Sequence, residues 1–151
     1  TNRLIRIGSN RMKMSRMHLV PMSKQVLNLF KELSKYSRGG EYVFPSPRDI
    51  DRPITPDSLR NAIRKLGIEK EEFTTHSFRS MASTRLNELG FKADVIEMQL
   101  AHVEGNKIRG AYNHAEYLPE RKKMMQDWSN YLDKLQNKTS VSPSVLQQSL
   151  Y

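Results

Sequence analysis

The sequence of 151 residues contains no cysteine, so it offers neither a disulfide framework nor a thiolate metal site. No apolar run approaches the ~20 residues that a membrane-spanning helix needs, and the mean hydropathy is −0.68. Residues 1–6 do not form the apolar core of a signal peptide. The length fits one domain with a modest core, and the composition suits a reducing cytoplasm.

Acidic residues are also scarce: the sequence has 16 Asp and Glu residues and 25 Lys and Arg residues, which gives a net charge of +9. The excess is uneven, because residues 1–38 hold nine basic residues against Glu32 alone, whereas the rest holds 16 basic and 15 acidic residues. A one-sided basic segment indicates a polyanionic partner, with DNA or RNA first. The alternative is the solvated surface of a merely basic protein. Membrane-surface binding is not favoured, because no basic amphipathic helix with an aromatic face is present.

Hydrophobic patterning predicts a mainly α-helical α+β fold with a small antiparallel β-hairpin. Polarity alternates over residues 4–7 and 14–20, with the turn residues Gly8, Ser9 and Asn10 between them. Helical spacing predicts helices that begin after Ser23, after Thr55 and after Thr74 or Thr75. Two more are predicted over residues 93–101 and 120–136. The second and third helices should bury apolar stripes, made of Leu59, Ala62, Ile63 and Leu66, and of Phe78, Met81, Ala82, Leu86 and Leu89.

The stretch 74–117 carries the chemistry, in four polar groups: His76, Arg79, His102 and Tyr112. Two imidazoles, a guanidinium and a phenol can together bind a phosphate and attack it. Tyrosine is a weak nucleophile because its pKa is about 10. It becomes effective where cationic donors stabilise the charge that develops on the group under attack. An Arg suits that task because its planar fork meets two phosphate oxygens at once.

His76 and Arg79 lie three residues apart in the first turn of a predicted helix, so they share a face. Unpaired main-chain N–H groups and the helix dipole also favour an anion there. His102 follows the helix over 93–101, where the dipole favours a protonated imidazole that donates to a phosphate oxygen. The alternative for these three residues is structural: a capping-region histidine, a surface arginine and a satisfied surface histidine.

The same residues resemble the boxes of a known family. His76-Ser77-Phe78-Arg79 is similar to the His-x-x-Arg box of the tyrosine recombinases, the phage integrase family. Leu100-Ala101-His102 is similar to its Leu-Gly-His box, and Tyr112 falls at the spacing of the family's nucleophile. The segments GNKIRGAYN at 105–113 and WSNYL at 128–132 resemble the branch of prophage and genomic-island integrases. The resemblance runs from about residue 3 to residue 135.

The resemblance implies the catalytic fold of these DNA breaking-rejoining enzymes and a mechanism without cofactor or metal. Tyr112 would attack a DNA phosphate to give a 3′-phosphotyrosyl link, while His76, Arg79 and His102 stabilise the transition state. Lys13 matches the family's hairpin lysine, which is thought to protonate the leaving 5′-oxygen. Without the resemblance, Lys13 is one solvated lysine among many.

Several further assignments accompany this interpretation. Tyr117 competes with Tyr112 as nucleophile, but its spacing from His102 is less favourable. A zinc site made of His76, His102 and His114 is rejected, because neither a His-x-x-x-His motif nor a carboxylate at ligand spacing is present. The candidate contacts to DNA phosphates are Arg11, Arg16, Arg60 and Arg64; for the last two, a solvated helix face is an equal alternative.

The resemblance also implies a domain layout and partners. Residues 1–135 match the C-terminal portion of an integrase catalytic domain, and 136–151 form a linker and a tail that docks in cis or in trans. The first Arg of the family's site has no match, so the isolated stretch, as an N-terminally truncated piece, is expected to be inactive. The expected partners are double-stranded DNA attachment sites, other protomers in a tetrameric synapse, host DNA-bending proteins and an excision factor, in the bacterial cytoplasm at the nucleoid. The rival interpretation is a basic DNA-binding module without chemistry.

Overall fold

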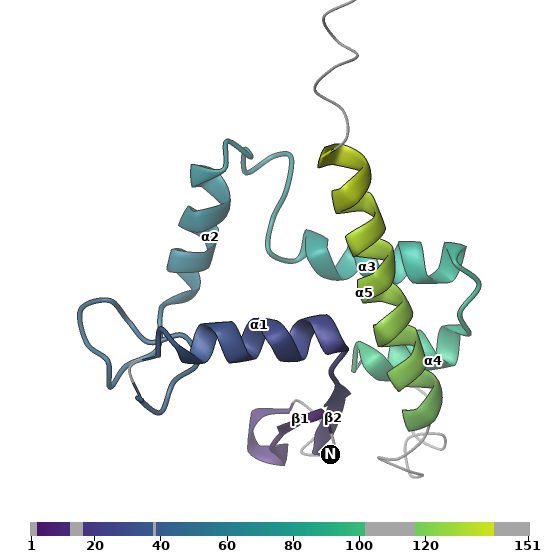
Figure 1. Cartoon of the computed structure of the whole chain (residues 1–151), viewed down its shortest axis with the longest axis horizontal. Helices are drawn as coiled ribbons and strands as arrows, with labels where there is room; N and C mark the ends of the chain where they lie inside the picture. The colour runs from purple at the N-terminus through teal and green to yellow at the C-terminus, as the bar shows by residue number, and fades with distance from the viewer. Residues whose placement is uncertain (1–2, 13–16, 38, 102–116, 141–151) are drawn as a thin grey trace, which may run out of the picture. The chain divides into compact units, whose positions relative to one another are not determined.

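The computed structural model describes residues 3–12, 17–37, 39–101 and 117–140, and Figure 1 labels the helices and strands. These residues divide between two compact units. Unit 1 comprises Thr1–Gln25 and Tyr112–Tyr151, and unit 2 comprises Val26–Ala111. Within the described ranges there are five α-helices, one short 3-10 turn and a two-stranded antiparallel sheet. The predicted α+β class, mainly helical with a small hairpin, is therefore confirmed.

Unit 1 contains the hairpin, formed by β1 (Leu4–Ile7) and β2 (His18–Pro21). Its register pairs Arg6 with Leu19 and Leu4 with Pro21. Met22 donates its N–H to the carbonyl of Arg3 at 2.9 Å, so Arg3 and Met22, next along the ladder, form a hydrogen-bonded pair. Hydrogen-bonded and non-hydrogen-bonded pairs alternate in an antiparallel ladder, so Pro21 falls in a pair that needs no N–H from it. The second strand was predicted to begin at residue 14; residues 14–16 lie outside the described part, and β2 begins at His18.

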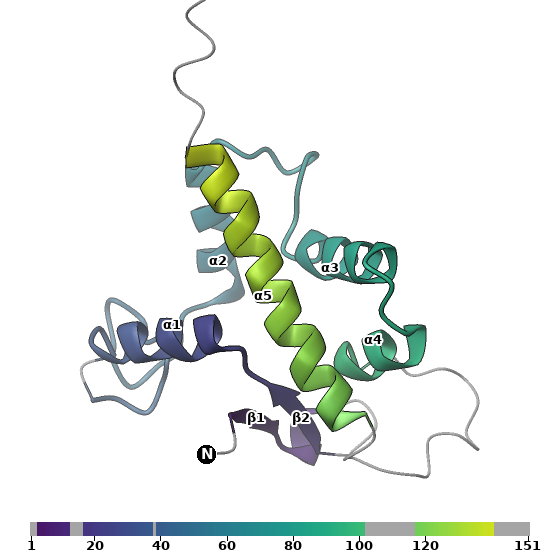
Figure 2. The same cartoon turned by 45° about the vertical axis from the view of Figure 1, so that its right-hand side comes forward.

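Helix α5 (Leu118–Ser140) packs against β2 (Figure 2). Met124 is fully buried on this helix, as the predicted apolar stripe requires, and Trp128 stacks on Tyr131 with ring centroids 5.7 Å apart. The helix continues four residues past its predicted end at residue 136, because Asn137–Ser140 contains neither Gly nor Pro to end it.

A set of polar contacts, here called the polar seam, joins α5 to the chain that leaves β2. The buried Ser129 donates its hydroxyl to that of the buried Ser23 at 2.7 Å. Gln126 accepts from the main-chain N–H of Lys24 at 2.9 Å and donates to the side chain of Gln25 at 2.8 Å. The full seam comprises Leu19, Ser23, Lys24 and Gln25 on one side and Arg121, Gln126, Ser129, Asn130 and Asp133 on the other.

Unit 2 contains most of α1 (Lys24–Ser34), together with α2 (Pro56–Lys65), α3 (Ser77–Glu88) and α4 (Ala93–Gln99). The predicted start of α2 is confirmed: Thr55 is the N-cap, its hydroxyl accepts from the N–H of Ser58, and Pro56 is the first helical residue. Leu86 of α3 is buried, and α3 contacts α4, whose Val95 and Ile96 are at most 2% exposed.

The apolar stripes of α2 and α3 are less buried than predicted. Ile63 and Leu86 are buried, but Leu66 is 77% exposed and Phe78 is 54% exposed. Leu59, Met81 and Leu89 are also exposed. Periodicity identifies the residues that share a face, but it does not say how much neighbouring chain covers that face.

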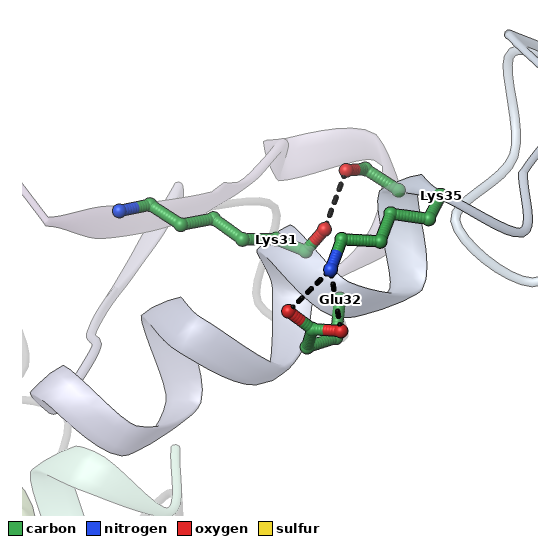
Figure 3. A network of polar contacts seen from close by, with 4 residues as sticks. Lys31, Glu32 and Lys35 are labelled. Atoms are coloured by element: carbon green, nitrogen blue, oxygen red, sulfur yellow. Dashed lines mark hydrogen bonds and ion pairs between the residues drawn. The ribbon is translucent and has the colours of Figure 1, made fainter.

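The surface of α1 shows how part of the basic charge is neutralised (Figure 3). The ammonium of Lys35 lies 2.7 and 2.8 Å from the two carboxylate oxygens of Glu32, whereas the Lys31 side chain extends away from this pair. Both partners are more than half exposed. Such an exposed pair adds at most about 1 kcal/mol to stability, so its main effect is to reduce the positive potential near Lys35.

Candidate active site

The start of α3 presents His76 and Arg79 on one open depression of about 250 Å³, as their spacing predicts. Ser80, Ser83 and Thr84 complete its lining. A histidine, an arginine and three hydroxyls are all donors that a phosphate accepts from, so the depression suits an anion. The hydroxyls of Ser80, Ser83 and Thr84 extend the depression along α3 beyond its first turn.

Main-chain N–H groups contribute less to this depression than the sequence suggested. A turn over residues 74–77 precedes the helix, and Ser77 donates its N–H to Thr74 at 3.0 Å. His76 already has helical angles of −72° and −26°, and its carbonyl accepts from Arg79 and Ser80. The Thr74 hydroxyl lies 3.1 Å from the Ser77 hydroxyl. It does not cap the N-terminus of α3, although a cap by Thr74 or Thr75 was predicted. The N–H groups of Ser77, Arg79 and Ser80 therefore already donate within the chain. The side chains of His76 and Arg79 are the main groups of the depression that can attract an anion.

Arg79 also connects two helices. It is half-buried, and its Nη2 donates to the carbonyl of Leu100, the residue that caps the C-terminal end of α4. A guanidinium carries five donors, so this bond is compatible with phosphate binding. The contact fixes the first residue of the Leu100-Ala101-His102 box beside the arginine of the first box. Two boxes separated by about twenty residues in sequence thus meet at one guanidinium.

Four of the predicted site residues lie outside the described residues: Lys13, Arg16, His102 and Tyr112. Their roles stay predictions, as does the contribution of His114. The competing tyrosine, Tyr117, is described: it is half-buried, has a φ of 57°, and its carbonyl accepts the N–H of Arg121 at 2.7 Å as α5 begins.

The described phosphate-binding candidates differ from one another. Arg11 is exposed at the end of the 3-10 turn Ser9–Arg11. Arg60 is exposed and lies 3.0 Å from Asp57. Arg64 is half-buried and donates to the carbonyls of Ile68 and Phe73, so it stabilises the chain that follows α2. Of the two arginines on α2, Arg60 is thus the better placed for an external phosphate.

Sequence reasoning missed Arg121, whose side chain is only 1% exposed. Its Nη2 donates to the carbonyl of Leu19 in β2, and burial lowers the pKa of its guanidinium. The signal was available, because Arg121 lies three residues before Met124 and four before Met125, on the face of the apolar stripe. The hydroxyls of Ser80, Ser83 and Thr84 were also missed, although Ser80 and Thr84 follow His76 at spacings of four and eight.

No group of three or more His, Asp or Glu side chains in the described ranges is arranged to hold a metal ion. The helices within those ranges also lack the length and apolar character of a membrane span.

The described geometry gives an open depression that suits an anion, on a mainly helical α+β fold, and comparison with known proteins identifies the family. Residues 1–118 match the model of the phage integrase family. The chain belongs to that family, which confirms the resemblance carried by the His76–Arg79 and Leu100–His102 boxes.

Similar proteins include the integrase of Shigella phage Sf6 and the prophage integrase IntS of Escherichia coli K12, each 43% identical over 133 residues. The integrase of Enterobacteria phage P4 is 39% identical over 137 residues. These alignments cover 87%, 87% and 89% of this chain but only 34%, 34% and 31% of the relatives. The chain thus spans about a third of the length of these relatives. No solved structure matches it at a comparable level of significance.

Proposed function

We propose that this chain contributes the strand-cleaving part of a tyrosine site-specific recombinase that integrates and excises a prophage or genomic island. The observation that carries the proposal is the meeting of His76 and Arg79 in one depression of α3, with Arg79 bound to the carbonyl of Leu100, the first residue of the Leu100-Ala101-His102 box. Membership of the phage integrase family supports it. The depression offers the cationic donors that phosphoryl transfer requires.

In the proposed cleavage, Tyr112 Oη attacks a DNA phosphorus. The bond from Tyr112 Oη to phosphorus forms, and the bond from phosphorus to the 5′-oxygen breaks. The phenolic proton passes to His76 or His102, and the leaving 5′-oxygen takes a proton from Lys13. Arg79, with the histidines, stabilises the charge on the pentavalent phosphorus. Attack by the 5′-hydroxyl of a partner strand reverses these steps and rejoins DNA.

The proposed partners follow from this chemistry. Double-stranded attachment sites are the substrate, and other protomers complete a tetrameric synapse. Host DNA-bending proteins and an excision factor would set the direction of the reaction. Arg11, Arg16 and Arg60 are proposed to bind DNA phosphates, and the proposed location is the nucleoid of a bacterial cytoplasm.

The test is covalent trapping by the natural protein that contains these residues. An attachment-site duplex is nicked next to the cleaved phosphate. The short fragment that bears the freed 5′-hydroxyl then diffuses away, and the protein stays attached to the other DNA end. Wild type should form an adduct that survives denaturant. Tyr112→Phe should abolish the adduct, and Tyr117→Phe should leave it intact. Arg79→Ala and His76→Ala should slow its formation by about 100-fold or more.

Each alternative gives a different result in this assay. An adduct lost only in Tyr117→Phe would keep the reaction and move the nucleophile. If wild type binds the duplex, shown by gel retardation, and yet forms no adduct, the rival interpretation of a DNA-binding module without chemistry replaces the proposal.

A separate proposal concerns residues 136–151. The first five belong to α5, and we propose that the remainder docks on this domain or on a neighbouring protomer. Hydrogen exchange should then show residues 141–151 protected, with protection that rises with protein concentration if docking is in trans. Exchange at the unfolded rate at every concentration would refute the docking.

A further inference from the structure

The feature that the proposed mechanism does not use is the buried guanidinium of Arg121. It is among the largest fully buried side chains in the described residues, at 1% exposure. Burial lowers its pKa, because removing a cation from water disfavours the charged form. An apolar side chain would fill the same space without this cost, and replacing buried ionic groups by apolar ones is often neutral or stabilising. Packing alone therefore does not explain an arginine here.

The bond from Arg121 to Leu19 supplies the explanation, because it reaches the outer edge of the hairpin. The pair Arg3–Met22 is hydrogen-bonded, so the alternation along the ladder makes Arg6–Leu19 a non-hydrogen-bonded pair. The Leu19 carbonyl then faces away from β1. Arg121 Nη2 donates to this carbonyl and thereby attaches the open edge of β2 to α5.

The attachment matters because a two-stranded hairpin is only marginally stable by itself. Its position is set by what it packs on, and here that is α5. The Ser23–Ser129 hydroxyl pair and the Gln25–Gln126 contact hold the chain just beyond β2 to the same helix. Within the polar seam, Arg121 is the residue that donates to β2, through the Leu19 carbonyl.

We propose that Arg121 is a positioning residue for DNA cleavage, acting through the hairpin that carries Lys13. This inference rests on the proposed function. Lys13 lies six residues before Leu19, on the connection between β1 and β2, whereas Arg121 lies nine residues after Tyr112. The bond therefore joins β2, the strand that follows the candidate acid in the sequence, to the helix that follows the candidate nucleophile. Proton transfer depends on placement, since a displacement of about 1 Å can cost about 100-fold in rate.

The leaving group provides a readout that separates positioning of Lys13 from a general loss of structure. In ordinary DNA the 5′-oxygen needs a proton as its bond to phosphorus breaks. If sulfur replaces that bridging oxygen, a thiolate leaves without a proton, because a thiol has a pKa of about 8.5. A variant that has only misplaced the acid should therefore recover on the sulfur-bridged duplex.

The experiment measures cleavage by wild type, Arg121→Met and Lys122→Met on the oxygen-bridged and sulfur-bridged duplexes. Arg121→Met keeps the length of the side chain without its donors, and Lys122→Met removes one positive charge from the exposed neighbouring position. Arg121→Met should be slower by ~10- to 100-fold on the oxygen duplex and should regain most of that loss on the sulfur duplex. Lys122→Met should match wild type on both.

Three further variants test whether Arg121 acts through Lys13. Lys13→Ala should show the same recovery on sulfur, and Lys13→Ala with Arg121→Met should be no slower than Lys13→Ala alone, because both act through one group. Arg121→Lys keeps one donor for the Leu19 carbonyl and should have an intermediate rate. If Arg121→Met does not fold, as judged by its thermal melt, Arg121→Lys carries the comparison of the two duplexes.

Equal losses on the two duplexes, additive losses in the double variant, or an unimpaired Arg121→Met would each overturn the inference while leaving the proposed function standing. A wild-type protein without adduct on either duplex would overturn the proposed function and this inference with it.

Discussion

Among the described residues other than glycine, two hold left-handed backbone angles: Ala101 has a φ of 51° and Tyr117 a φ of 57°. Such angles bring the Cβ atom close to the following carbonyl, which costs roughly 1–2 kcal/mol. Ala101 follows the C-terminal cap of α4, the position where helices most often place glycine. The Leu-Gly-His box of the family has glycine at this position, so the angle gives a physical reason for that preference.

Replacing Ala101 by glycine should therefore stabilise the protein. The relief of left-handed strain exceeds the larger entropy of glycine in the unfolded chain, and the expected net gain is about 0.5–1 kcal/mol. Chemical denaturation of the natural protein measures it. The matched control is Ala62→Gly in the interior of α2, which should destabilise by about 1 kcal/mol. If both substitutions destabilise equally, Ala101 is not strained.

Residue spacing predicted which side chains share a face but not what each would bind. His76 and Arg79 do line one depression, as the spacing of three indicates. The bond from Arg79 to the Leu100 carbonyl joins positions 21 residues apart, and no local pattern contains it. Arg121 shows the same limit, since its register on the apolar face predicts burial while its partner on β2 depends on tertiary packing.

The helices illustrate which predictions are reliable at the level of elements. The five helices predicted within the described residues are present, because apolar periodicity and the Thr55-Pro56 start are local signals. The helix predicted over 93–101 ends earlier, at Gln99, and α5 extends beyond its predicted end. The exposure of Leu66 and Phe78 could not be predicted, because it depends on which other segments cover each helix.

The chain after α2 provides a prediction at this scale. Arg64 donates to two carbonyls in that chain, so Arg64→Ala leaves both without this donor and should destabilise the protein by about 1–3 kcal/mol. Arg60→Ala, one turn earlier on the same helix, breaks only an exposed ion pair and should change stability by less than about 0.5 kcal/mol. Urea denaturation compares the two. If both substitutions have similarly small effects on stability, the two carbonyl contacts of Arg64 do not stabilise the protein.

At the scale of the whole molecule, the positive charge is distributed unevenly. Arg3, Arg6 and Arg11 are exposed in unit 1. Several basic residues elsewhere lie beside carboxylates, among them Arg52 at 3.1 Å from Asp49. The net charge of +9 therefore overstates the attraction of the paired regions for DNA and understates that of the N-terminal segment.

Salt dependence of DNA binding should reveal this difference. Each phosphate contact contributes about 0.9 to the slope of log K against log salt for duplex DNA. Arg11→Gln should weaken binding and reduce the slope by about 1, whereas Arg52→Gln, which removes an internally paired charge, should leave the slope unchanged. Fluorescence anisotropy on a labelled duplex over a salt series measures both. An unchanged slope in Arg11→Gln would exclude Arg11 from the phosphate contacts.

The grip of Arg121 on β2 has a consequence for how the protein can vary. It holds a main-chain carbonyl, which every amino acid possesses, and does not depend on which side chain occupies position 19. Hairpins from other integrases could therefore be grafted between Arg3 and Pro21 without redesign of α5, provided that their length keeps the register of Arg6 opposite Leu19. The side chain at position 19 can therefore change while Arg121 keeps its main-chain partner, so long as the hairpin keeps the candidate acid Lys13.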